Sequence, residues 1–468
     1  MLERVLGIGK TGNRFVDRNK GIVMETYDLK DSGIDCLGNI PKHWVKGKIK
    51  NRFFLKPSNV DKKSYDDEIS VELCNYVDVY YNDFITNDLA FMSATATDYE
   101  IKKFSLNIDD VLITKDSEDP MDIGVPALVK EIKPNLVCGY HLTMLRRRPC
   151  HVSGSFLFWA LKDEAIASQL YREATGVTRW AISSRNIKNV AIAYPDLNEQ
   201  KAIADYLDKA CQNIDKTITL KQQQLDKLEA YRKSLIHEAV TKGLDKTVPM
   251  KDSGVEWLGE IPEHWKSDRL KDFVIFNPTK NPARIKENEV VSIFPMEFIS
   301  ENGEILGRNE AIYKETDTGL NYFENGDVIF AKITPCMENG KGALIKDIPT
   351  RISLGSTEFF VLRPTFLVNA EYLYYLTRNQ YFRDFLEKNM KGAAGQQRVP
   401  AKFFKYTVLP LPNIEEQKTI ADYLDKACTN IDKTKETIAK QIKTLTQYRQ
   451  SLIHECVTGK KRVYQGTN

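Results

Sequence analysis

The sequence lacks the features on which membrane, secreted and disulfide-stabilised proteins depend. No run of about 18 apolar residues occurs, so we expect no membrane span. The N-terminal residues contain no apolar core long enough for a secretory signal. The eight cysteines are scattered and form no Cys-x-x-Cys pair, which is typical of reduced thiols in a cytosol. We therefore expect a cytoplasmic protein without a membrane partner.

A large charge excess is also missing. The 468 residues carry a net charge of only +3, which excludes a uniformly basic nucleic-acid binder but leaves room for a locally basic groove. The apolar fraction of 42% and the charged fraction of 28% are those of an ordinary globular protein. A chain of this length predicts about two to four domains.

Methyltransferase and nucleotide-binding motifs are absent as well. An Asn-Pro-Pro-aromatic motif would hold an extruded base, and the nearest approach, Phe276–Thr279, lacks the second proline and the aromatic residue. Gly9-Lys10-Thr11 resembles the end of a phosphate loop, but Arg4 stands where that loop needs a glycine. No other glycine-rich cofactor loop follows a predicted strand.

Two further chemistries find little support. Glu131 and Lys133, downstream of Asp110, fit a nuclease spacing that is common by chance, and the second half of the chain has no equivalent. The residues Cys138, His141, Cys150 and His151 can bind metals, but their spacing matches no familiar zinc site. We expect this chain to have no catalytic residues and no metal site.

Several segments of the sequence recur at a spacing of about 220 residues, which indicates two copies of one module. An opening segment, KDSGIDCLGNIPKHW at 30–44, returns as KDSGVEWLGEIPEHW at 251–265. The segment EQKAIADYLDKACQNIDKT at 199–217 returns at 416–434, and YRKSLIHEAVTKG at 231–243 returns at 448–459. We call each set of near-identical segments a frame. The two frames predict that the same function is performed twice in this chain.

The two inserts between the frame segments, roughly 46–190 and 267–407, share only a skeleton. Asp110–Lys115 corresponds to Asp327–Lys332, and both inserts carry Gly-x-x-Arg near their ends. A plain duplication with drift would erode frames and inserts alike. The contrast therefore indicates that the inserts do the same kind of job on different targets.

The second part of each frame predicts a long helix. Residues 198–240 contain no proline or glycine, and Asp196 and Asn413 can cap the helix starts. Apolar residues alternate at three- and four-residue steps, as in a coiled coil. The predicted seam or subunit interface comprises Ile203, Leu207, Ile214, Leu228, Tyr231, Leu235, Ile420, Leu424, Ile431, Leu445, Tyr448 and Leu452.

About 40 helical residues span ~60 Å, and a single helix of this kind cannot bury its seam. We expect the two copies to pack antiparallel against each other. A spacer role explains the apolar seam of these helices. The motif Tyr-Arg-x-Ser-Leu-Ile-His-Glu is repeated almost unchanged, including positions that a seam does not require, which favours a surface shared by both copies for a partner. His43, His264, His237 and His454 are interpreted as structural.

The inserts predict α+β recognition domains with short β-rich runs followed by helices. Basic and amide side chains on such a scaffold suit DNA, because Arg and Lys neutralise phosphates while Arg, Asn and Gln read base edges. Each one could equally be a solvated surface residue, and only positions paired between the inserts gain weight. The candidates for DNA binding are Lys115, Arg146, Thr178, Arg179, Lys332, Arg363, Gln396, Gln397 and Arg398.

On these motifs the chain resembles the specificity (S) subunits of type I restriction–modification systems. The resemblance rests on the opening segments, on Glu-Gln-x-x-Ile-Ala-Asp-Tyr-Leu-Asp at 199–208 and 416–425, and on Arg-x-Ser-Leu-Ile-His-Glu at 232–238 and 449–455. It covers nearly everything from about residue 30 to residue 459.

The resemblance implies two target-recognition domains, each reading one half of a bipartite site in double-stranded DNA. The long helices would act as a ruler for a half-site separation of about one DNA turn, ~34 Å. It also implies two methyltransferase subunits as partners, and restriction subunits in the cleaving complex. Adenine methylation with S-adenosylmethionine would belong to the methyltransferase partner, and this chain would bind no cofactor.

The expected fold is α+β, with two pseudo-symmetric recognition domains separated by two long antiparallel coiled-coil helices. We expect an N-terminal tail over 1–29, for which disorder is one expectation, and a C-terminal tail over 461–468. Between them lie recognition domain 1 (30–197), spacer helix 1 (198–245), recognition domain 2 (246–412) and spacer helix 2 (413–460). Two alternatives remain: a self-contained restriction–modification enzyme, and a coiled-coil scaffold that does not read DNA.

Overall fold

The computed structural model describes residues 27–149, 152–279, 285–316, 319–393 and 395–464. Nearer the N-terminus it gives the backbone of three strands, β1 (Ile8–Thr11), β2 (Arg14–Asp17) and β3 (Ile22–Glu25), which pair antiparallel in that order. Apart from these strands, the tail predicted over 1–29 lies outside the described residues up to residue 26, as do residues 465–468 of the C-terminal tail.

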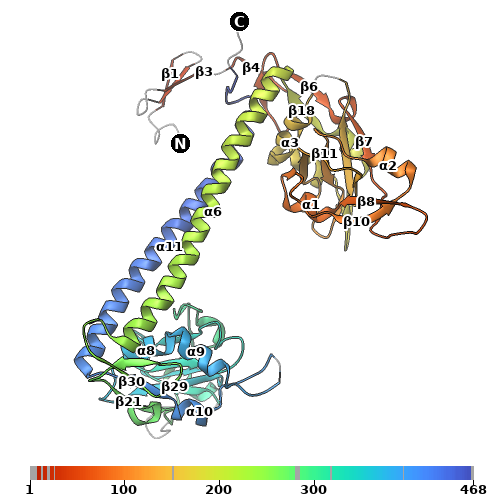
Figure 1. The fold of residues 1–468 in the computed structure, drawn as a ribbon. Coiled ribbons are helices and arrows are strands. Elements are labelled where there is room, and N and C mark those ends of the chain that lie inside the picture. The colour runs from red at the N-terminus through yellow and green to blue at the C-terminus, as the bar shows by residue number, and fades with distance from the viewer. Residues whose placement is uncertain are drawn as a thin grey trace. The chain divides into compact units, whose positions relative to one another are not determined.

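The chain forms two compact units that divide the long helices between them (Figure 1). Unit 1 comprises residues 1–221 and 440–468, and unit 2 comprises residues 222–439. Helix α6 spans Leu197–Lys242, and helix α11 spans Ile414–Val457. Each unit therefore holds one of the two inserts, one half of α6 and one half of α11.

The long helices begin at the predicted caps. Asp196 Oδ1 accepts hydrogen bonds from the backbone N–H groups of Asn198 and Glu199, and Asn413 Oδ1 accepts one from Glu416. These carboxylate and amide oxygens satisfy donors that the first turn of a helix leaves without partners. The sequence therefore defines where both helices start.

Within each unit the two helix halves pair antiparallel. In unit 1, Arg449 binds Asp215 and Lys221 binds Gln441, so residue numbers rise along α6 as they fall along α11. In unit 2, Lys435 pairs with Glu229 and Arg232 with Asp432 in the same sense. Each seam is thus closed by residues from the other copy of the repeat.

Unit 1 contains two main sheets. A five-stranded sheet has the order β7-β15-β11-β13-β9, with a parallel β13–β9 pair and antiparallel pairs elsewhere, and a three-stranded sheet has the order β10-β8-β14. Small sheets join β4 to β5, β6 to β18, and β12 to the β16–β17 hairpin. The strands are β4 (Leu29–Asp31), β5 (Asn39–Pro41), β6 (Val45–Lys48), β7 (Phe53–Pro57), β8 (Ile69–Cys74), β9 (Phe84–Ile85), β10 (Met92–Ala96), β11 (Val111–Thr114), β12 (Asp116–Ser117), β13 (Pro126–Val129), β14 (Leu136–Cys138), β15 (Leu142–Arg147), β16 (Thr175–Gly176), β17 (Trp180–Ala181) and β18 (Ala191–Tyr194).

Unit 2 repeats this plan with two four-stranded sheets. Their orders are β22-β29-β26-β27 and β24-β23-β28-β25, and β19–β20 and β21–β30 form the small pairs. The strands are β19 (Met250–Asp252), β20 (Glu260–Pro262), β21 (Lys266–Arg269), β22 (Val274–Phe276), β23 (Val290–Phe294), β24 (Asn309–Ile312), β25 (Asn321–Phe323), β26 (Val328–Ala331), β27 (Gly342–Leu344), β28 (Ser353–Gly355), β29 (Phe359–Pro364) and β30 (Val408–Leu411).

Short helices cover the sheets of both units. The first helix of each helical pair, α3 or α8, packs on the central sheet. In unit 1 the helices are α1 (Tyr76–Tyr81), α2 (Asp98–Phe104), α3 (Gly154–Lys162), α4 (Glu164–Tyr171) and α5 (Ser184–Asn189). In unit 2 they are α7 (Leu270–Phe273), α8 (Ala370–Arg378), α9 (Gln380–Glu387) and α10 (Ala401–Tyr406).

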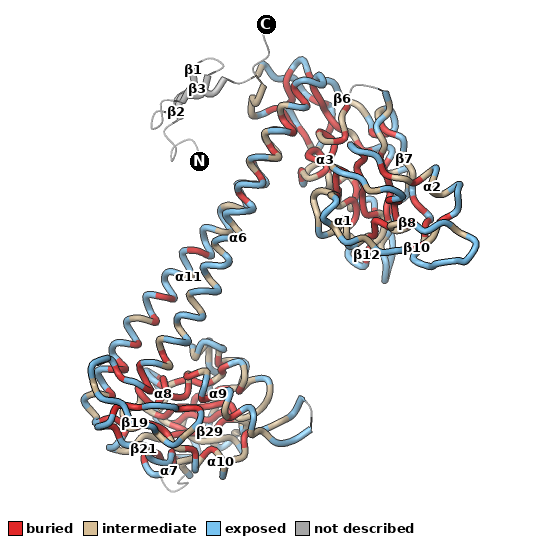
Figure 2. Tube along the Cα trace, in the orientation of Figure 1, coloured by how far each residue is buried: buried red, intermediate tan, exposed pale blue. Residues whose placement is uncertain are grey.

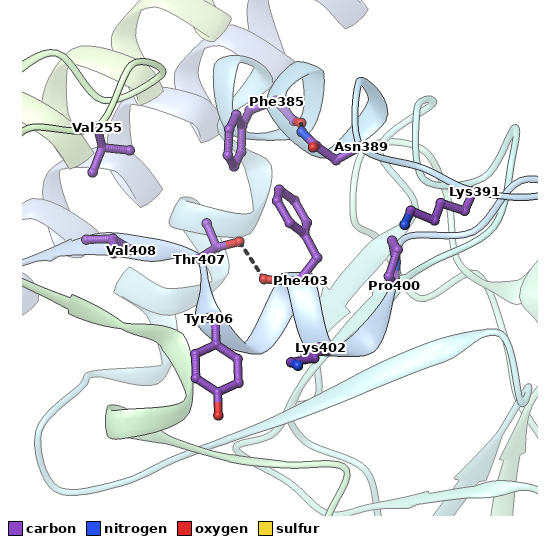
Figure 3. A pocket seen from close by; sticks show the side chains of 10 residues that line it. All are labelled: Val255, Phe385, Asn389, Lys391, Pro400, Lys402, Phe403, Tyr406, Thr407 and Val408. Carbon is purple, nitrogen blue, oxygen red and sulfur yellow. Dashed lines mark hydrogen bonds between the residues drawn. The ribbon is translucent and has the colours of Figure 1, made fainter.

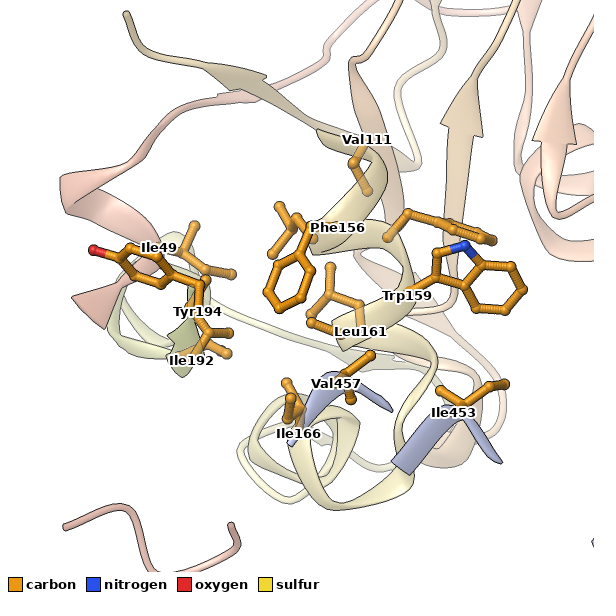
Figure 4. Packing of buried hydrophobic residues seen from close by; sticks show 14 of the residues in the cluster. Ile49, Val111, Phe156, Trp159, Leu161, Ile166, Ile192, Tyr194, Ile453 and Val457 are labelled. Atoms are coloured by element: carbon orange, nitrogen blue, oxygen red, sulfur yellow. The ribbon is translucent and has the colours of Figure 1, made fainter. Parts of the chain in front are cut away.

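The core of unit 1 joins the insert to both long helices. Figure 4 shows Phe156, Trp159 and Leu161 of α3 packed near Ile453 and Val457 of α11, and these residues are at most 2% exposed. The core of unit 2 likewise includes residues from the end of α6 and the start of α11. Burial is concentrated in the sheets and where the helices meet them (Figure 2), so each helix half is an integral part of its unit.

The repeated opening segment clamps the start of a long helix. In unit 1 the buried Glu199 accepts hydrogen bonds from Tyr27 Oη at 2.7 Å and Trp44 Nε1 at 3.2 Å, and His43 Nε2 lies 2.8 Å away. In unit 2, Glu416 accepts a hydrogen bond from Trp265 Nε1 at 2.9 Å. Burial and the Glu199 carboxylate both raise the pKa of Tyr27. The repeated His-Trp and Glu therefore fix the start of each long helix to the opening segment of its unit.

The observed architecture confirms the predicted fold class. Helices and strands are mixed in both units, the two inserts share one plan, and the continuous helix α6 links them. Within the described residues, no helix is both long enough and apolar enough to cross a membrane.

Candidate nucleic-acid interface

Two of the predicted DNA-binding arginines hold buried aspartates. Arg146 donates to both oxygens of Asp110, with Nη2 2.6 Å from Oδ2, and Arg363 donates to both oxygens of Asp327 at 2.8 and 2.7 Å. Both aspartates are 2% exposed. A buried carboxylate needs such a partner, so these arginines serve the sheets. Their contact with DNA stays a prediction.

The paired lysines after β11 and β26 anchor similar loops but differ in exposure. Lys115 is half-buried and donates from Nζ to the carbonyl of Ser58 at 2.9 Å, and burial lowers its pKa. Lys332 lies nearer the surface and donates to the carbonyl of Thr357 at 2.8 Å. Because Lys332 is less enclosed, it is the better placed of the two to reach a phosphate.

The two Gly-x-x-Arg arginines lie beside the residues that follow these lysines, but their registers differ. Asp116 pairs with Ala181 in unit 1, whereas Ile333 pairs with Arg398 in unit 2. Arg398 thus occupies the strand position of Ala181, two residues beyond Arg179. Arg398 therefore lies within the paired segment, whereas Arg179 lies in the turn that joins β16 to β17.

Each of these arginines is held by a carboxylate. Arg179 donates from Nε at 3.0 Å and from Nη2 at 2.6 Å to Oδ1 of Asp116. Arg398 donates to both oxygens of Glu358, with Nη2 2.8 Å from Oε1 and Nε 3.0 Å from Oε2. The arginine side chains remain 52% and 45% exposed. The Arg398 hydrogen bonds lower the pKa of Glu358.

The remaining predicted contacts lie around these arginines. Thr178 and Gln396 are exposed in the two loops, and Gln397 is partly buried. The backbone of Gln397 is fixed by Thr334, whose Oγ1 accepts from its N–H at 3.0 Å and whose N–H donates to its carbonyl at 3.0 Å. The C-terminal end of the unit 2 loop thus has a fixed backbone.

The sequence interpretation missed the two acids that hold these arginines and assigned no role to His141. His141, considered only as a metal ligand, lies 2.5 Å from Asp116 and 3.1 Å from Nη2 of Arg179. Burial lowers its pKa. Cys150 and His151 lie outside the described residues. His141 and Glu358 occupy matching positions just before β15 and β29, which was the available signal.

A pocket lies next to the unit 2 loop (Figure 3). It encloses about 620 Å³ and is lined by aromatic residues and by Lys391 and Lys402. Lys391 pairs with Arg398 at the base of the loop, and Lys402 is on α10. Neither lysine amine has a hydrogen-bond or ion-pair partner within the described part of the chain, so both are available to an anionic ligand.

Unit 1 has a pocket at the corresponding place, between its opening segment and helices α4 and α5. That pocket encloses about 460 Å³, and Gln169, Arg172, Glu173, Asn186 and Asn189 give it a polar lining. The two units therefore share a plan around the loop and differ in its chemistry.

These features agree with the comparisons to known proteins. The sequence model described as "Type I restriction modification DNA specificity domain" matches residues 41–230 and 262–444. The chain belongs to this family. The resemblance inferred from the repeated motifs is thereby confirmed.

Individual relatives support this assignment. The type I restriction enzyme EcoAI specificity subunit of Escherichia coli is 31% identical over 202 residues, which cover 40% of this chain and 34% of that protein. The chain thus spans about a third of the length of that relative.

Two solved structures share the fold. A chain from a study of complex assembly and conformational transition of the type I R-M system has a TM-score of 0.66 at 14% identity, covering 90% of this chain and 99% of that one. The HsdS subunit from Thermoanaerobacter tengcongensis has a TM-score of 0.54 at 16% identity, covering 90% and 98%. At such identities the likeness concerns the fold alone.

The helical seam of this specificity-family chain is mostly buried. Ile203, Leu207, Ile420, Leu424 and Leu452 are at most 1% exposed, and Ile214 and Ile431 are also buried. Leu228, Leu235 and Leu445 are partly buried. The structure instead leaves Tyr231 and Tyr448 56% and 51% exposed, so they belong to the surface rather than to the seam.

The recurring Arg-x-Ser-Leu-Ile-His-Glu motif is largely used inside each unit. Arg449 binds Asp83 and Asp215, and His454 Nδ1 lies 2.8 Å from Asp163. These contacts account for the repeated arginine and histidine without an external partner. These contacts do not account for the exposed Ser and Glu of the motif, or for the exposed Tyr that precedes its Arg.

Proposed function

We propose that this chain is the DNA-reading subunit of a type I restriction–modification complex and has no catalytic activity of its own. Each unit reads one half of a bipartite site in double-stranded DNA. The observation that carries the proposal is the recurrence of a glycine-bearing loop with an exposed arginine at the same place in two inserts of different sequence. A shared plan with different side chains suits two domains that read different bases.

The contacts to DNA divide into two classes. Lys332, Lys391 and Lys402 lie around the unit 2 loop and suit phosphates, which position a protein on DNA without reading its sequence. Arg179 with Thr178, and Arg398 with Gln396 and Gln397, suit base edges. The net charge of only +3 is compatible with this arrangement, because a few exposed cations are enough to make a locally basic surface.

The proposed partners are two methyltransferase subunits. Six outward-facing positions of the long helices carry identical residues in the two repeats, and each unit presents the same set from one half of α6 and one half of α11. In unit 1 the set is Asp205, Lys209, Asn213, Tyr448, Ser451 and Glu455, and in unit 2 it is Asp422, Lys426, Asn430, Tyr231, Ser234 and Glu238. Two equal surfaces suit two copies of one partner.

The chemistry is assigned to those partners. S-adenosylmethionine would bind to the methyltransferase subunits, which would methylate adenine, and restriction subunits would join for cleavage. The long helices set the spacing of the half-sites in this proposal.

A methylation map of the host genome tests the proposal directly. Single-molecule sequencing with the gene intact and deleted should show one bipartite methylated-adenine motif that disappears on deletion. If the motif persists, the chain is not the specificity subunit of that activity. If the locus is silent in the host, co-expression with a methyltransferase subunit from the same organism in a methylation-free strain provides the same test.

A further inference from the structure

We propose that the ion pairs Asp116–Arg179 and Glu358–Arg398 each read one guanine of a half-site, with the carboxylate orienting the arginine. This inference rests on the proposed function and deepens it. It assigns a base-reading role to the arginines and a positioning role to two acids that no sequence motif marked.

Among the described residues, Nη1 of each guanidinium is available on the edge away from the acid, and in unit 1 Nη2 of Arg179 also lies 3.1 Å from Nδ1 of His141. In both pairs the carboxylate takes the Nε and Nη2 donors. The opposite edge, formed by Nη1 and the second Nη2 hydrogen, is then directed away from the acid. Nη1 of Arg398 has only a long contact of 3.4 Å to the carbonyl of Gln396. Two parallel donors at this edge match the O6 and N7 acceptors of guanine.

The charge of each pair favours a base over a phosphate. A carboxylate in contact with the arginine brings the local net charge close to zero, and an anionic phosphate would be repelled by the acid. A base edge carries no net charge and loses little from that neighbour. Within the part of the chain that the structure describes, the amines of Lys391 and Lys402 have no ion-pair partner, and they suit phosphates.

Stability does not explain why both units have such a pair. Exposed ion pairs typically contribute about 0–1 kcal/mol. The two pairs are also built differently, because Asp116 follows β11 whereas Glu358 precedes β29, and the arginines differ by two residues in register. Different residues thus produce a carboxylate-held arginine at the end of the Gly-x-x-Arg segment in both units, which indicates a shared use for it.

The loop geometry presents the arginine outward. In unit 1, Gly176 pairs with Trp180, and the three residues between them form the turn, where Val177 is 93% exposed. A Cβ on Gly176 would lie 2.0 Å from the carbonyl oxygen of Arg179, so only glycine permits this close turn. The turn is therefore narrow and can approach a groove.

The experiment uses the assembled methyltransferase complex and its methylation motif. Arg398→Ala should relax one guanine position in one half-site, with about a 10- to 100-fold loss of discrimination there, and leave the other half-site unchanged. Arg179→Ala should relax one guanine in the other half-site. Glu358→Gln and Asp116→Asn should relax the same two positions less. Arg308→Ala, which removes an exposed arginine paired with Glu310 elsewhere in unit 2, is the control and should leave the motif intact.

A measurement from the DNA side does not depend on variant folding. Guanines in a duplex carrying the motif are replaced singly by 7-deazaguanine, which lacks the N7 acceptor. The unaltered complex should lose about 10-fold in affinity at one guanine per half-site. Three outcomes would overturn the inference while leaving the proposed function intact. They are a half-site without guanine, affinity that does not change with 7-deazaguanine at any position, and arginine variants that lower methylation equally at all sites. A complex with no bipartite motif at all would overturn both.

Discussion

The acid at the start of each long helix offers a test of how the domains are attached. Glu199→Ala removes the carboxylate that receives Tyr27, His43 and Trp44, and Glu416→Ala removes its counterpart in unit 2. The side chain of Glu199 is 4% exposed, whereas that of Glu416 is 26% exposed. The two substitutions therefore differ in burial while sharing their chemistry.

The expected effects follow from the donors left behind. A hydrogen bond to a charged group contributes about 1.5–3 kcal/mol, and a buried donor without a partner costs about 1–3 kcal/mol. Glu199→Ala leaves the indole N–H of Trp44, which is 0% exposed, without a hydrogen-bond acceptor. The hydroxyl of Tyr27 loses the same acceptor. We expect a loss of about 3–5 kcal/mol in unit 1, against about 1–3 kcal/mol for Glu416→Ala in unit 2, where water can replace the lost acceptor.

Hydrogen exchange read by mass spectrometry can separate the two units. Peptides from 30–44 and 251–265 report the free energy of local opening at each clamp. Glu199→Gln is the matched control, because it keeps the size of the side chain and one acceptor, and should lie between the wild type and the alanine variant. If the two alanine variants opened equally, or if Glu199→Ala changed the opening free energy by less than ~1 kcal/mol, burial of the acid would not govern the attachment.

Four further outcomes are expected. Arg383 is buried with Nε and Nη2 unpaired within the described residues, so Arg383→Met should raise the urea-unfolding free energy of unit 2 by about 1–2 kcal/mol; a decrease would contradict this. Burial lowers the pKa of His237, so the unfolded chain binds more protons, and unit 2 should lose stability as pH falls below about 6.5; a His237→Gln variant with the same pH profile would contradict it. Lys402→Ala should reduce the slope of log affinity against log salt by about 1, and an unchanged slope would exclude a phosphate contact. Four residues inserted after Gln222 lengthen α6 by about 6 Å and should widen the spacer of the methylated motif by one or two base pairs; an unchanged spacer would refute the ruler.

Local sequence signals predicted the helical frame because they act over a few residues. Asp196 and Asn413 cap the first turns that the sequence places after them, and the apolar steps of the helices locate Ile203, Leu207 and Leu424 at the seam. Even so, periodicity alone could not tell that Tyr231 faces solvent. A tyrosine at a seam position is resolved only by what the neighbouring helix places opposite it.

The candidate interface was predictable as a region but not as a set of contacts. The pairing of Gly-x-x-Arg in both inserts directed attention to Arg179 and Arg398. The same logic selected Arg146 and Arg363, which the structure commits to Asp110 and Asp327. Paired positions identify residues that both domains need, and an internal ion pair is as much a shared need as a DNA contact.

The sequence by itself determined the duplication, the two long helices with their caps, the mixed fold of the inserts and the family of the chain. Only the tertiary structure decided which cationic side chains pair with acids inside the units and which acids hold Arg179 and Arg398. It also decided the two-residue difference in register between these arginines. The reason is distance along the chain. Arg179 and Asp116 are 63 residues apart, and Arg398 and Glu358 are 40 apart, so no local propensity links them. Sheet pairing brings each pair together, and sheet pairing is set by the folding of the whole domain.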